Sequence, residues 1–353
     1  MRMNDALHLA GEWILAHEAR RPDFIGAYLG GSAAALGDGD ELPAGSDLDV
    51  FAVLSDPPPM KPGKFEFGGL LLEVSYVAEE QIFPAGRALS DYHLAHSLHL
   101  RRTLYDPDGR LGALQRTVAE NFARREWLLH RRDHALSRVQ NGLSAFNPAA
   151  PLPDRTLGWL FPTGICTHAV LVAALQNPTV RLRYLKARQV LADEGFSDVH
   201  ERLLSLSGFA EVAPSIARGL LSRLEPIYDR AAAAGRTPLP YSSDVSPQCR
   251  AVAIDSLRPL IERGDHREAM FWILTGYARA MKILSLDDPD GYALYLPDFL
   301  AALAAVNRET DAQVNAARRA VLDFLPELAR VTDVIAARHC ASETPCAAAQ
   351  KLI

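Results

Sequence analysis

Residues 27–32 have the sequence AYLGGS, and residues 46–54 have the sequence SDLDVFAVL. The first stretch predicts a strand that ends in a glycine loop, and the second predicts a strand with one polar face. Because side chains alternate along a strand, Asp47 and Asp49 are expected on the same face. Two carboxylates this close repel each other unless a cation neutralises them, and hard oxygen ligands suit Mg²⁺.

The sequence that follows predicts the rest of a small sheet. Residues 64–77, KFEFGGLLLEVSYV, predict two strands joined by a Gly-Gly turn, and residues 102–106 predict a last strand. Ahead of this hairpin, DPPPMKPG at 56–63 forms a rigid connector that no regular element continues through. Residues 78–100 and the N-terminal segment are expected to be helices around this sheet.

Glu73 stands within the apolar run of the second hairpin strand, between Leu72 and Val74. A carboxylate in such a run needs a partner. Placed beside the strand of Asp47 and Asp49, Glu73 completes a cluster of three carboxylates. Such a cluster can hold two divalent ions across a phosphoryl centre.

The Gly30-Gly31-Ser32 loop fits phosphate binding. Glycines let the backbone approach phosphates closely, and backbone N–H groups and the Ser32 hydroxyl can donate to phosphate oxygens. Ser46, directly before the carboxylates, completes the expected nucleotide-binding set. We therefore expect Gly30, Gly31, Ser32 and Ser46 to contact the nucleotide, and Asp47, Asp49 and Glu73 to serve as catalytic and metal-binding residues.

Beyond residue 112 the pattern is helical, with apolar residues at three- and four-residue spacing. The expected fold class is α/β in the broad sense (α+β): a small mixed-sheet domain over residues 1–112 and an all-helical bundle over 113–340 that supplies an acceptor pocket. Residues 341–353 are expected to be a frayed tail. The expected helices span 112–140, 155–175, 183–194, 199–206, 213–234, 248–262, 265–284, 296–306 and 309–338.

Gly31-Ser32, then Asp47-x-Asp49, then a strand-borne Glu73 resemble the signature of the nucleotidyltransferase superfamily that includes DNA polymerase β. The small first domain followed by a helical domain is similar to the antibiotic nucleotidyltransferases of the kanamycin and lincosamide type. The signature covers roughly residues 25–110, under a third of the chain. The spacer between Ser32 and Asp47 departs from it, because it is long and carries Asp38, Asp40 and Glu41. It is either a mobile flap over the triphosphate or a surface loop.

The resemblance implies transfer of a nucleoside monophosphate, AMP from ATP by preference, to a hydroxyl of a small molecule, with release of pyrophosphate. Ser32 would contact the β- and γ-phosphates, and Asp47 and Asp49 would bind two Mg²⁺ ions. Glu73 would either bind the second ion or accept the proton of the acceptor hydroxyl. An aminoglycoside-like antibiotic is the expected acceptor class, which implies a role in antibiotic resistance, and a homodimer is known among similar enzymes.

Two other functions remain open at this stage. Similar domains add nucleotides to tRNA or to proteins, as toxins do, and a non-catalytic nucleotide-binding protein would keep the fold alone. Residues 1–110 carry 17 acidic and 9 basic side chains, within an overall formal charge of −6. This acidity argues against nucleic acid as a partner and favours a cationic acceptor.

The remaining composition indicates a cytoplasmic protein that does not bind a membrane. The cysteines at 166, 249, 340 and 346 form no CxxC pair, which favours free thiols. The sequence has no run of about 18 apolar residues, so no membrane-spanning helix is expected.

Three other groups of side chains are expected to be structural. His93, His96 and His99 are spaced three apart, which is awkward for ligands of one metal and favours a helical interface or surface. His130 and His134 are four apart and could share a metal, but no Glu follows the first as in HExxH, so a solvated face is favoured. Arg181, Arg183, Lys186 and Arg188 are interpreted as a solvated helix face, with Arg181 as the candidate for facing a triphosphate.

Overall fold

The structure is a computed structural model that describes residues 1–43 and 46–341. The chain divides into two compact units. Of the described residues, the first contains 1–134, 171–181 and 333–341, and the second contains 135–170 and 182–332. This division differs from the boundary expected at residue 112, because later segments pack with the N-terminal part. The expected tail, including Cys346, lies outside the described residues apart from Ala341.

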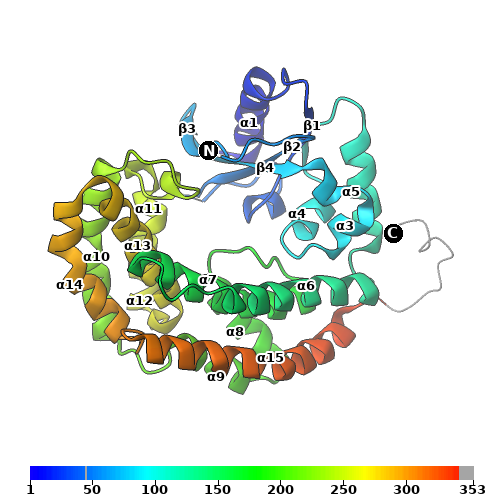
Figure 1. Ribbon diagram of the computed structural model, residues 1–353. Coiled ribbons are helices and arrows are strands. Elements are labelled where there is room, and N and C mark those ends of the chain that lie inside the picture. The colour runs from blue at the N-terminus through cyan, green and yellow to red at the C-terminus, as the bar shows by residue number, and fades with distance from the viewer. Residues whose placement is uncertain (44–45, 342–353) are drawn as a thin grey trace. The chain divides into compact units, whose positions relative to one another are not determined.

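The first unit contains a mixed five-stranded sheet in the order β3-β4-β2-β1-β5 (Figure 1). Strands β2 and β4 are parallel, and the other neighbouring pairs are antiparallel. The expected strands are confirmed, and the fold class is mixed α+β. The strands are β1 (Phe24–Leu29), β2 (Leu48–Leu54), β3 (Gly63–Phe67), β4 (Leu70–Ala78) and β5 (Thr103–Tyr105).

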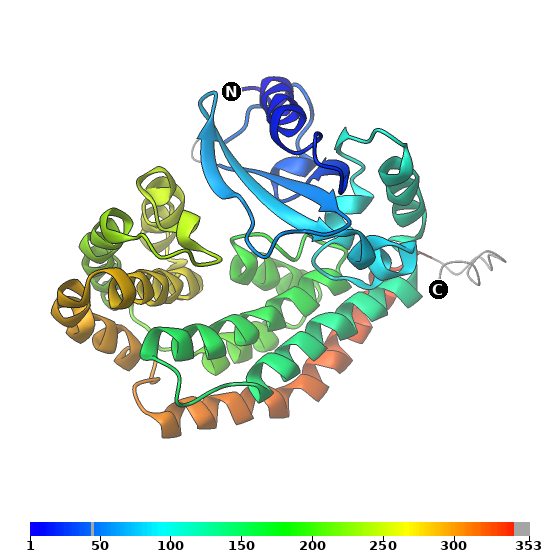
Figure 2. The same ribbon diagram turned by 45° about the horizontal axis from the view of Figure 1, so that its top comes forward.

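The expected hairpin is formed by β3 and β4, the blue strands at one edge of the sheet in Figure 2. It turns at Gly68 and Gly69, whose φ angles are +58° and +77°. Positive φ at both central residues is what the tightest hairpin turns require, and glycine adopts it without strain. The two-residue turn fixes the register, so that Lys64 lies opposite Glu73.

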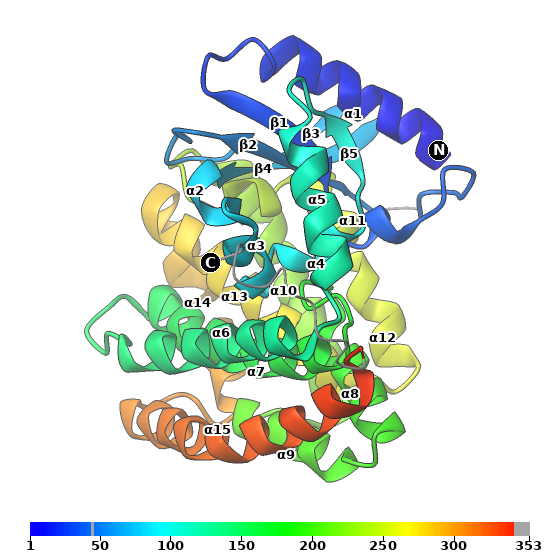
Figure 3. The same ribbon diagram turned by 90° about the vertical axis from the view of Figure 1, so that its right-hand side faces the viewer.

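The two faces of the sheet are covered by different helices (Figure 3). On one face, α1 (Met3–His17) packs its Met3, Ala6 and Ile14 against Val50 and its neighbours on β1, β2 and β4. The other face packs against short helices and the start of α6 (Arg125–Ser144). These helices are α2 (Glu79–Ile82), α3 (Ala85–Ser90), α4 (Ala95–His99) and α5 (Arg110–Asn121).

The acidic spacer between β1 and β2 is tied to the start of the chain. It begins with the short helix η1 (Ala33–Ala35). The backbone N–H of Met3 donates to Asp40 O at 2.9 Å, and that of Asn4 donates to Asp38 O at 3.0 Å. The Asp38 carboxylate also pairs with Arg102 at 2.8 Å. These bonds favour a surface loop over a mobile flap for residues 37–42.

Helices and connecting segments make up the whole of the second unit, and its core centres on α13. Met270, Phe271, Leu274 and Met281 of α13 are fully buried, and the Tyr277 hydroxyl donates to Leu220 O of α10 at 2.9 Å. The long helices of the later chain, some of which belong to both units, are α6 (Arg125–Ser144), α7 (Leu152–Ala173), α8 (Arg183–Asp193), α9 (Ser197–Ser207), α10 (Pro214–Ala234), α13 (His266–Asp287), α14 (Pro289–Ala304) and α15 (Asp311–His339).

Three expected helices have different bounds in the structure. The helix expected over 112–140 is interrupted between α5 and α6, where Arg124 N donates to Asn121 O. The helix expected over 248–262 is a series of short turns that ends in α12 (Arg258–Glu262), whose Pro259 cannot donate a backbone bond. Helix α14 starts earlier than expected, at Pro289, because Asp288 caps it by accepting from Gly291 N.

Helix α7 is long and apolar enough to cross a membrane by its length and composition, with a mean hydropathy of 1.4 in its most apolar window. However, 72% of that window is buried inside the protein. Leu160, Ala169 and Val170 are fully buried. The core helices of folded domains can be as long and as apolar as membrane-spanning helices, and the burial of this helix is typical of them. Its sequence is therefore weak support for a membrane protein.

Cys166 and Cys340 have free thiols, as expected, and Cys249 donates its thiol to Ser243 O at 3.1 Å. Cys166 and Cys249 are buried. No disulfide contributes to the fold among these described cysteines. The stability of both units therefore rests on their apolar cores and polar contacts.

Candidate functional site

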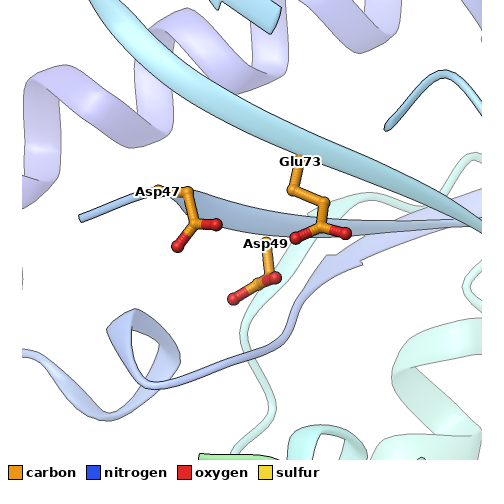
Figure 4. Close-up of side chains that lie close together, drawn as sticks. All are labelled: Asp47, Asp49 and Glu73. Atoms are coloured by element: carbon orange, nitrogen blue, oxygen red, sulfur yellow. The ribbon is translucent and has the colours of Figure 1, made fainter. Parts of the chain in front are cut away.

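Asp49 and Glu73 lie opposite each other in the parallel pairing of β2 and β4. Both side chains point to the face of the sheet that is remote from α1, because the residues on either side of them, such as Val50 and Val74, fill the α1 core. Figure 4 shows the two carboxylates close together on the same side of the neighbouring strands. The register of the sheet therefore produces the close approach that the sequence pattern predicts.

Asp47 precedes the first residue of β2 and joins the same cluster (Figure 4). One carboxylate oxygen from each of Asp47, Asp49 and Glu73 lies within 4.8 Å of the others. All three residues are half-buried. The expected carboxylate trio is thus assembled, and among the described residues it is the sole group of three or more His, Cys, Asp or Glu side chains with this proximity.

Gly30 and Gly31 pass so close to side chains of β2 that no larger residue fits. A Cβ atom on Gly31 would lie 1.7 Å from Asp49 Oδ2, and Gly31 has a φ of +63°. A Cβ atom on Gly30 would lie 2.1 Å from the ring of Phe51, and Gly30 N donates to Asp49 O at 2.9 Å. The loop is therefore held directly against the carboxylate strand.

The two expected serine contacts lie at either end of the long spacer. Ser32 is exposed at the start of η1, and its hydroxyl makes no capping bond there. Ser46 is half-buried, and its backbone N–H donates to Pro43 O at 3.0 Å. Ser32 directly follows Gly31, the residue whose Cβ position lies against Asp49.

Two lysines contact the trio, and the sequence pattern did not identify either as part of the site. Lys64 on β3 places its Nζ against both Asp47 Oδ2 and Glu73 Oε2, the latter at 2.5 Å. Lys61 donates to Glu73 Oε1 at 2.5 Å and to Ser75 Oγ at 3.4 Å. The Lys64 side chain is only 11% exposed. These two ammonium groups offset two of the three negative charges of the trio.

The lysines also set the ionisation of Glu73. Burial by itself would raise the pKa of the Glu73 carboxyl, because it disfavours the charged form. The positive charges of Lys64 and Lys61 outweigh this and lower the pKa to about 2. Glu73 is therefore a carboxylate at any pH near neutrality.

The side chains of the trio fit a hard divalent cation. Its donors are carboxylate oxygens alone, which Mg²⁺ and Ca²⁺ prefer. Two oxygens on opposite sides of a Mg²⁺ ion lie about 4 Å apart. The observed separations of up to 4.8 Å therefore need only a small movement to close around such an ion. A cation placed among all three would compete with Lys64 for Asp47 and Glu73.

A third residue outside the sequence prediction holds the glycine loop. Asn177 Nδ2 donates to Gly31 O at 3.2 Å. Asn177 belongs to the segment 171–181, which is part of the same unit as the sheet. A contact between residues so far apart in the chain leaves no local signal in the sequence.

Lys64, in contrast, could have been found from the sequence. A two-residue turn at Gly68-Gly69 pairs residue 67 with 70 and therefore Lys64 with Glu73. Lys61 lies in the proline-rich connector, where no periodicity places its side chain.

The histidine clusters are packed among aromatic rings. His99 stacks on Phe122 with ring centroids 3.8 Å apart, and His96 lies against His99 at 4.8 Å. Burial lowers the pKa of His96 to about 4, so this ring is neutral. His134 accepts from Tyr92 N at 3.4 Å, and His130 lies edge-on to Trp127. His96 and His99 therefore lie in a packed interface, one of the two roles expected for their cluster. The solvated face expected for His130 and His134 fits the exposed His130 but not the half-buried His134.

The basic run at 181–188 is divided between the two units. Arg181 belongs to the unit of the sheet, whereas the three that follow lie on α8 in the other unit. Arg188 donates to Asp265 at 2.7 Å and to Glu268 at 2.8 Å, and Arg183 lies over the ring of Phe271. The interpretation as one solvated face therefore fits the exposed Lys186 but not its arginine neighbours.

Comparison of the chain with known protein families gives no matching family model, and comparison with curated proteins gives no relative. The functional argument therefore rests on the site itself.

Proposed function

We propose that this protein is a nucleotidyltransferase that transfers a nucleoside monophosphate from a Mg²⁺-nucleoside triphosphate to a hydroxyl group. The observation that carries the proposal is the carboxylate trio of Asp47, Asp49 and Glu73 beside the Gly30-Gly31 loop. The trio fits divalent cations, and the loop lets a triphosphate approach them along the backbone. The order of these residues along the chain resembles the nucleotidyltransferase superfamily, which supports the same reaction.

Asp47 and Asp49 are the proposed ligands of two Mg²⁺ ions, and Glu73 is placed either to hold one of them or to accept the proton of the attacking hydroxyl. When bound, the ions neutralise charge on the phosphates and on the attacking and leaving oxygens. The loop residues position the donor, with backbone N–H groups and the Ser32 hydroxyl directed to the β- and γ-phosphates.

In the proposed reaction the acceptor oxygen forms a bond to the α-phosphorus as the bond from that phosphorus to the β-phosphate oxygen breaks. Pyrophosphate leaves with the bonding electron pair, and the hydroxyl proton passes to a carboxylate or to water. Positioning and charge neutralisation supply the rate acceleration in such transfers.

A small, hydroxylated and cationic acceptor fits the charge of the chain best. Residues 1–110 carry 17 acidic side chains and 9 basic ones, so a cationic molecule is attracted to this part of the protein. ATP is the proposed donor, and an aminoglycoside-like antibiotic is the proposed acceptor class. The site is proposed to work in the cytoplasm, where Mg²⁺ and ATP are abundant.

The test is incubation of the protein with Mg²⁺, each of the four nucleoside triphosphates and a panel of hydroxylated amines, followed by mass spectrometry. We expect one acceptor to gain a nucleoside monophosphate in the wild type and none in the Asp49→Asn variant. Binding of Mg-nucleotide without transfer to any panel member would contradict the acceptor class. Total tRNA and protein from the same incubation would reveal a macromolecular acceptor.

The competing explanation is that the lysines make the trio a purely structural ion-pair network. In that case Lys64 and Lys61 already satisfy the carboxylates, and no divalent cation binds. Calorimetric titration of the wild type with Mn²⁺ distinguishes the two explanations, because a metal-binding trio binds the ion and a purely structural ion-pair network does not.

A further inference from the structure

The glycine loop is held from a part of the chain that the sequence places among the helices. After α7 ends at Ala173, the chain stays with the unit of the sheet through residue 181. In this segment Asn177 donates its side-chain N–H to the carbonyl oxygen of Gly31 at 3.2 Å. The two residues are 146 positions apart in the sequence.

The orientation of the Asn177 side chain is set by its own segment. Its Oδ1 atom accepts from Thr179 N at 3.0 Å and from Thr179 Oγ1 at 2.9 Å. A backbone N–H can only donate, so the oxygen of the amide must face Thr179 and the NH₂ group must face Gly31. Both ends of the amide are therefore satisfied in this orientation, whereas the flipped one would oppose two donors at Thr179 N and two acceptors at Gly31 O.

Fixing the Gly31 carbonyl also fixes the N–H group of Ser32. The peptide between the two residues is trans, since Phe83-Pro84 is the cis bond found among the described residues. In a planar trans peptide the C=O and N–H groups point in opposite directions. The Ser32 N–H therefore points away from Asn177. Glycine at 31, with its φ of +63°, has the freedom to rotate this peptide if the anchor is removed.

We propose that Asn177 is a positioning residue for the triphosphate: it locks the Gly31–Ser32 peptide so that the Ser32 N–H can donate to a phosphate oxygen. This inference rests on the proposed function, because it assigns the loop a phosphate ligand. It makes the segment after α7 part of the donor site, although that segment lies far beyond the sheet in the sequence. Asn177 acts through the loop, by its bond to Gly31 O.

The sharpest variant is Asn177→Asp. It keeps the oxygen that accepts from Thr179, loses the N–H group that donates to Gly31, and sets a negative charge against the Gly31 carbonyl. Asn177→Ala is a second variant that removes the anchor without adding charge. Gln176→Ala is the matched control, because it removes a similar amide from the exposed neighbouring position.

Calorimetry with Mg²⁺ and inorganic tripolyphosphate, and with each of the four Mg-nucleoside triphosphates, measures the effect. We expect both Asn177 variants to weaken binding about five- to tenfold, which is what loss of one ordering hydrogen bond produces. The factor should be the same for tripolyphosphate and for every nucleotide, because the loop contacts phosphates. Affinity for Mn²⁺ alone should be unchanged, and Gln176→Ala should behave as the wild type.

Hydrogen exchange of the unliganded protein gives a readout that does not depend on any ligand. Amides in residues 30–36 should exchange faster in both Asn177 variants than in the wild type. Unchanged phosphate affinity in these variants, or a loss limited to thermal stability, would overturn the inference while leaving the proposed function intact. Failure of the wild type to bind any Mg-nucleotide would overturn both.

Discussion

Glu73 on β4 lies opposite Asp49 on one neighbouring strand and opposite Lys64 on the other. The three side chains form a row across β3, β4 and β2, with two like charges next to each other and one cation at the end. A pair of facing carboxylates is unfavourable in a sheet unless a positive charge offsets it. The row therefore requires a cation, and in the protein without metal Lys64 supplies it.

Replacement of Lys64 by methionine should weaken the protein without metal and strengthen its affinity for divalent cations. Loss of the ammonium group leaves Asp47 and Glu73 without the cation that joins them, at a cost of about 2 kcal/mol in the free energy of unfolding. The same loss removes the competitor for these carboxylates, so Mn²⁺ affinity measured by calorimetry should rise about tenfold.

Lys61→Met is the comparison for this experiment, because Lys61 contacts Glu73 and Ser75 but shows no contact with Asp47 among the bonds of the structure. Its effect on Mn²⁺ affinity should be smaller. Weaker Mn²⁺ binding by Lys64→Met than by the wild type would show that Lys64 supports the cation site instead of competing with it.

Alanine at position 31 should disable nucleotide binding. Its Cβ atom would meet Asp49 Oδ2 at 1.7 Å, so the carboxylate must move out of the trio. We expect the affinity for Mg-nucleotide to fall by more than about tenfold in a calorimetric titration. Alanine at a φ of +63° also costs about 1–2 kcal/mol of stability from backbone strain.

The variant Gly109→Ala separates the backbone strain from the clash with Asp49. Gly109 has a similar φ of +70°, and nothing lies within 4 Å of the position its Cβ would take. This variant should show the same strain in thermal unfolding but bind Mg-nucleotide as the wild type does. Equal loss of binding in both variants would mean that general destabilisation, and not the clash with Asp49, is responsible.

The ion pairs of Glu73 should make the stability of the protein depend on acid pH. Its pKa is about 2 in the folded protein, below the ordinary value of 4.5. A group with a depressed folded pKa stabilises the protein fully above its unfolded pKa and loses that contribution as pH falls toward the folded pKa. The loss therefore begins near pH 5 and is complete near pH 2.

Between pH 7 and pH 4, Glu73 should account for a loss of about 1 kcal/mol in the free energy of unfolding. Urea unfolding at several pH values, with a chelator present to exclude metal ions, measures this loss of stability. The Glu73→Gln variant lacks the titrating group, so its stability should fall less over this range. Parallel curves for the two proteins would show that Glu73 is not held by the lysines in solution.

The sheet and the carboxylate trio could be predicted because both follow from short-range rules. Alternation places Asp47 and Asp49 on one face, and the Gly68-Gly69 turn sets the hairpin that carries Glu73. The same rules also predict the pairing of Lys64 with Glu73. The break between α5 and α6 was missed because the apolar periodicity continues through it, and packing of the folded chain decides where a helix ends.

Contacts between residues far apart in the chain do not follow from such short-range rules. Nothing in the local pattern brings Asn177 to Gly31, because their contact depends on how the chain returns to the sheet after α7. The attachment of the acidic spacer to residues 1–4 is of the same kind, since it is made by backbone groups that carry no sequence signal. Such contacts decide which part of the chain holds the loop, and only the structure shows them.

The most direct test of the central claim is calorimetric titration of the protein with ATP, GTP, CTP and UTP, each with Mg²⁺ and with a chelator. It requires no knowledge of the acceptor. We predict that the wild type binds at least one nucleotide only when Mg²⁺ is present, and that the Asp47→Asn/Asp49→Asn variant, folded by thermal unfolding, does not. Absence of metal-dependent binding in the wild type, or binding that survives in the double variant, would contradict the assignment of the trio as the metal site of a nucleotidyltransferase.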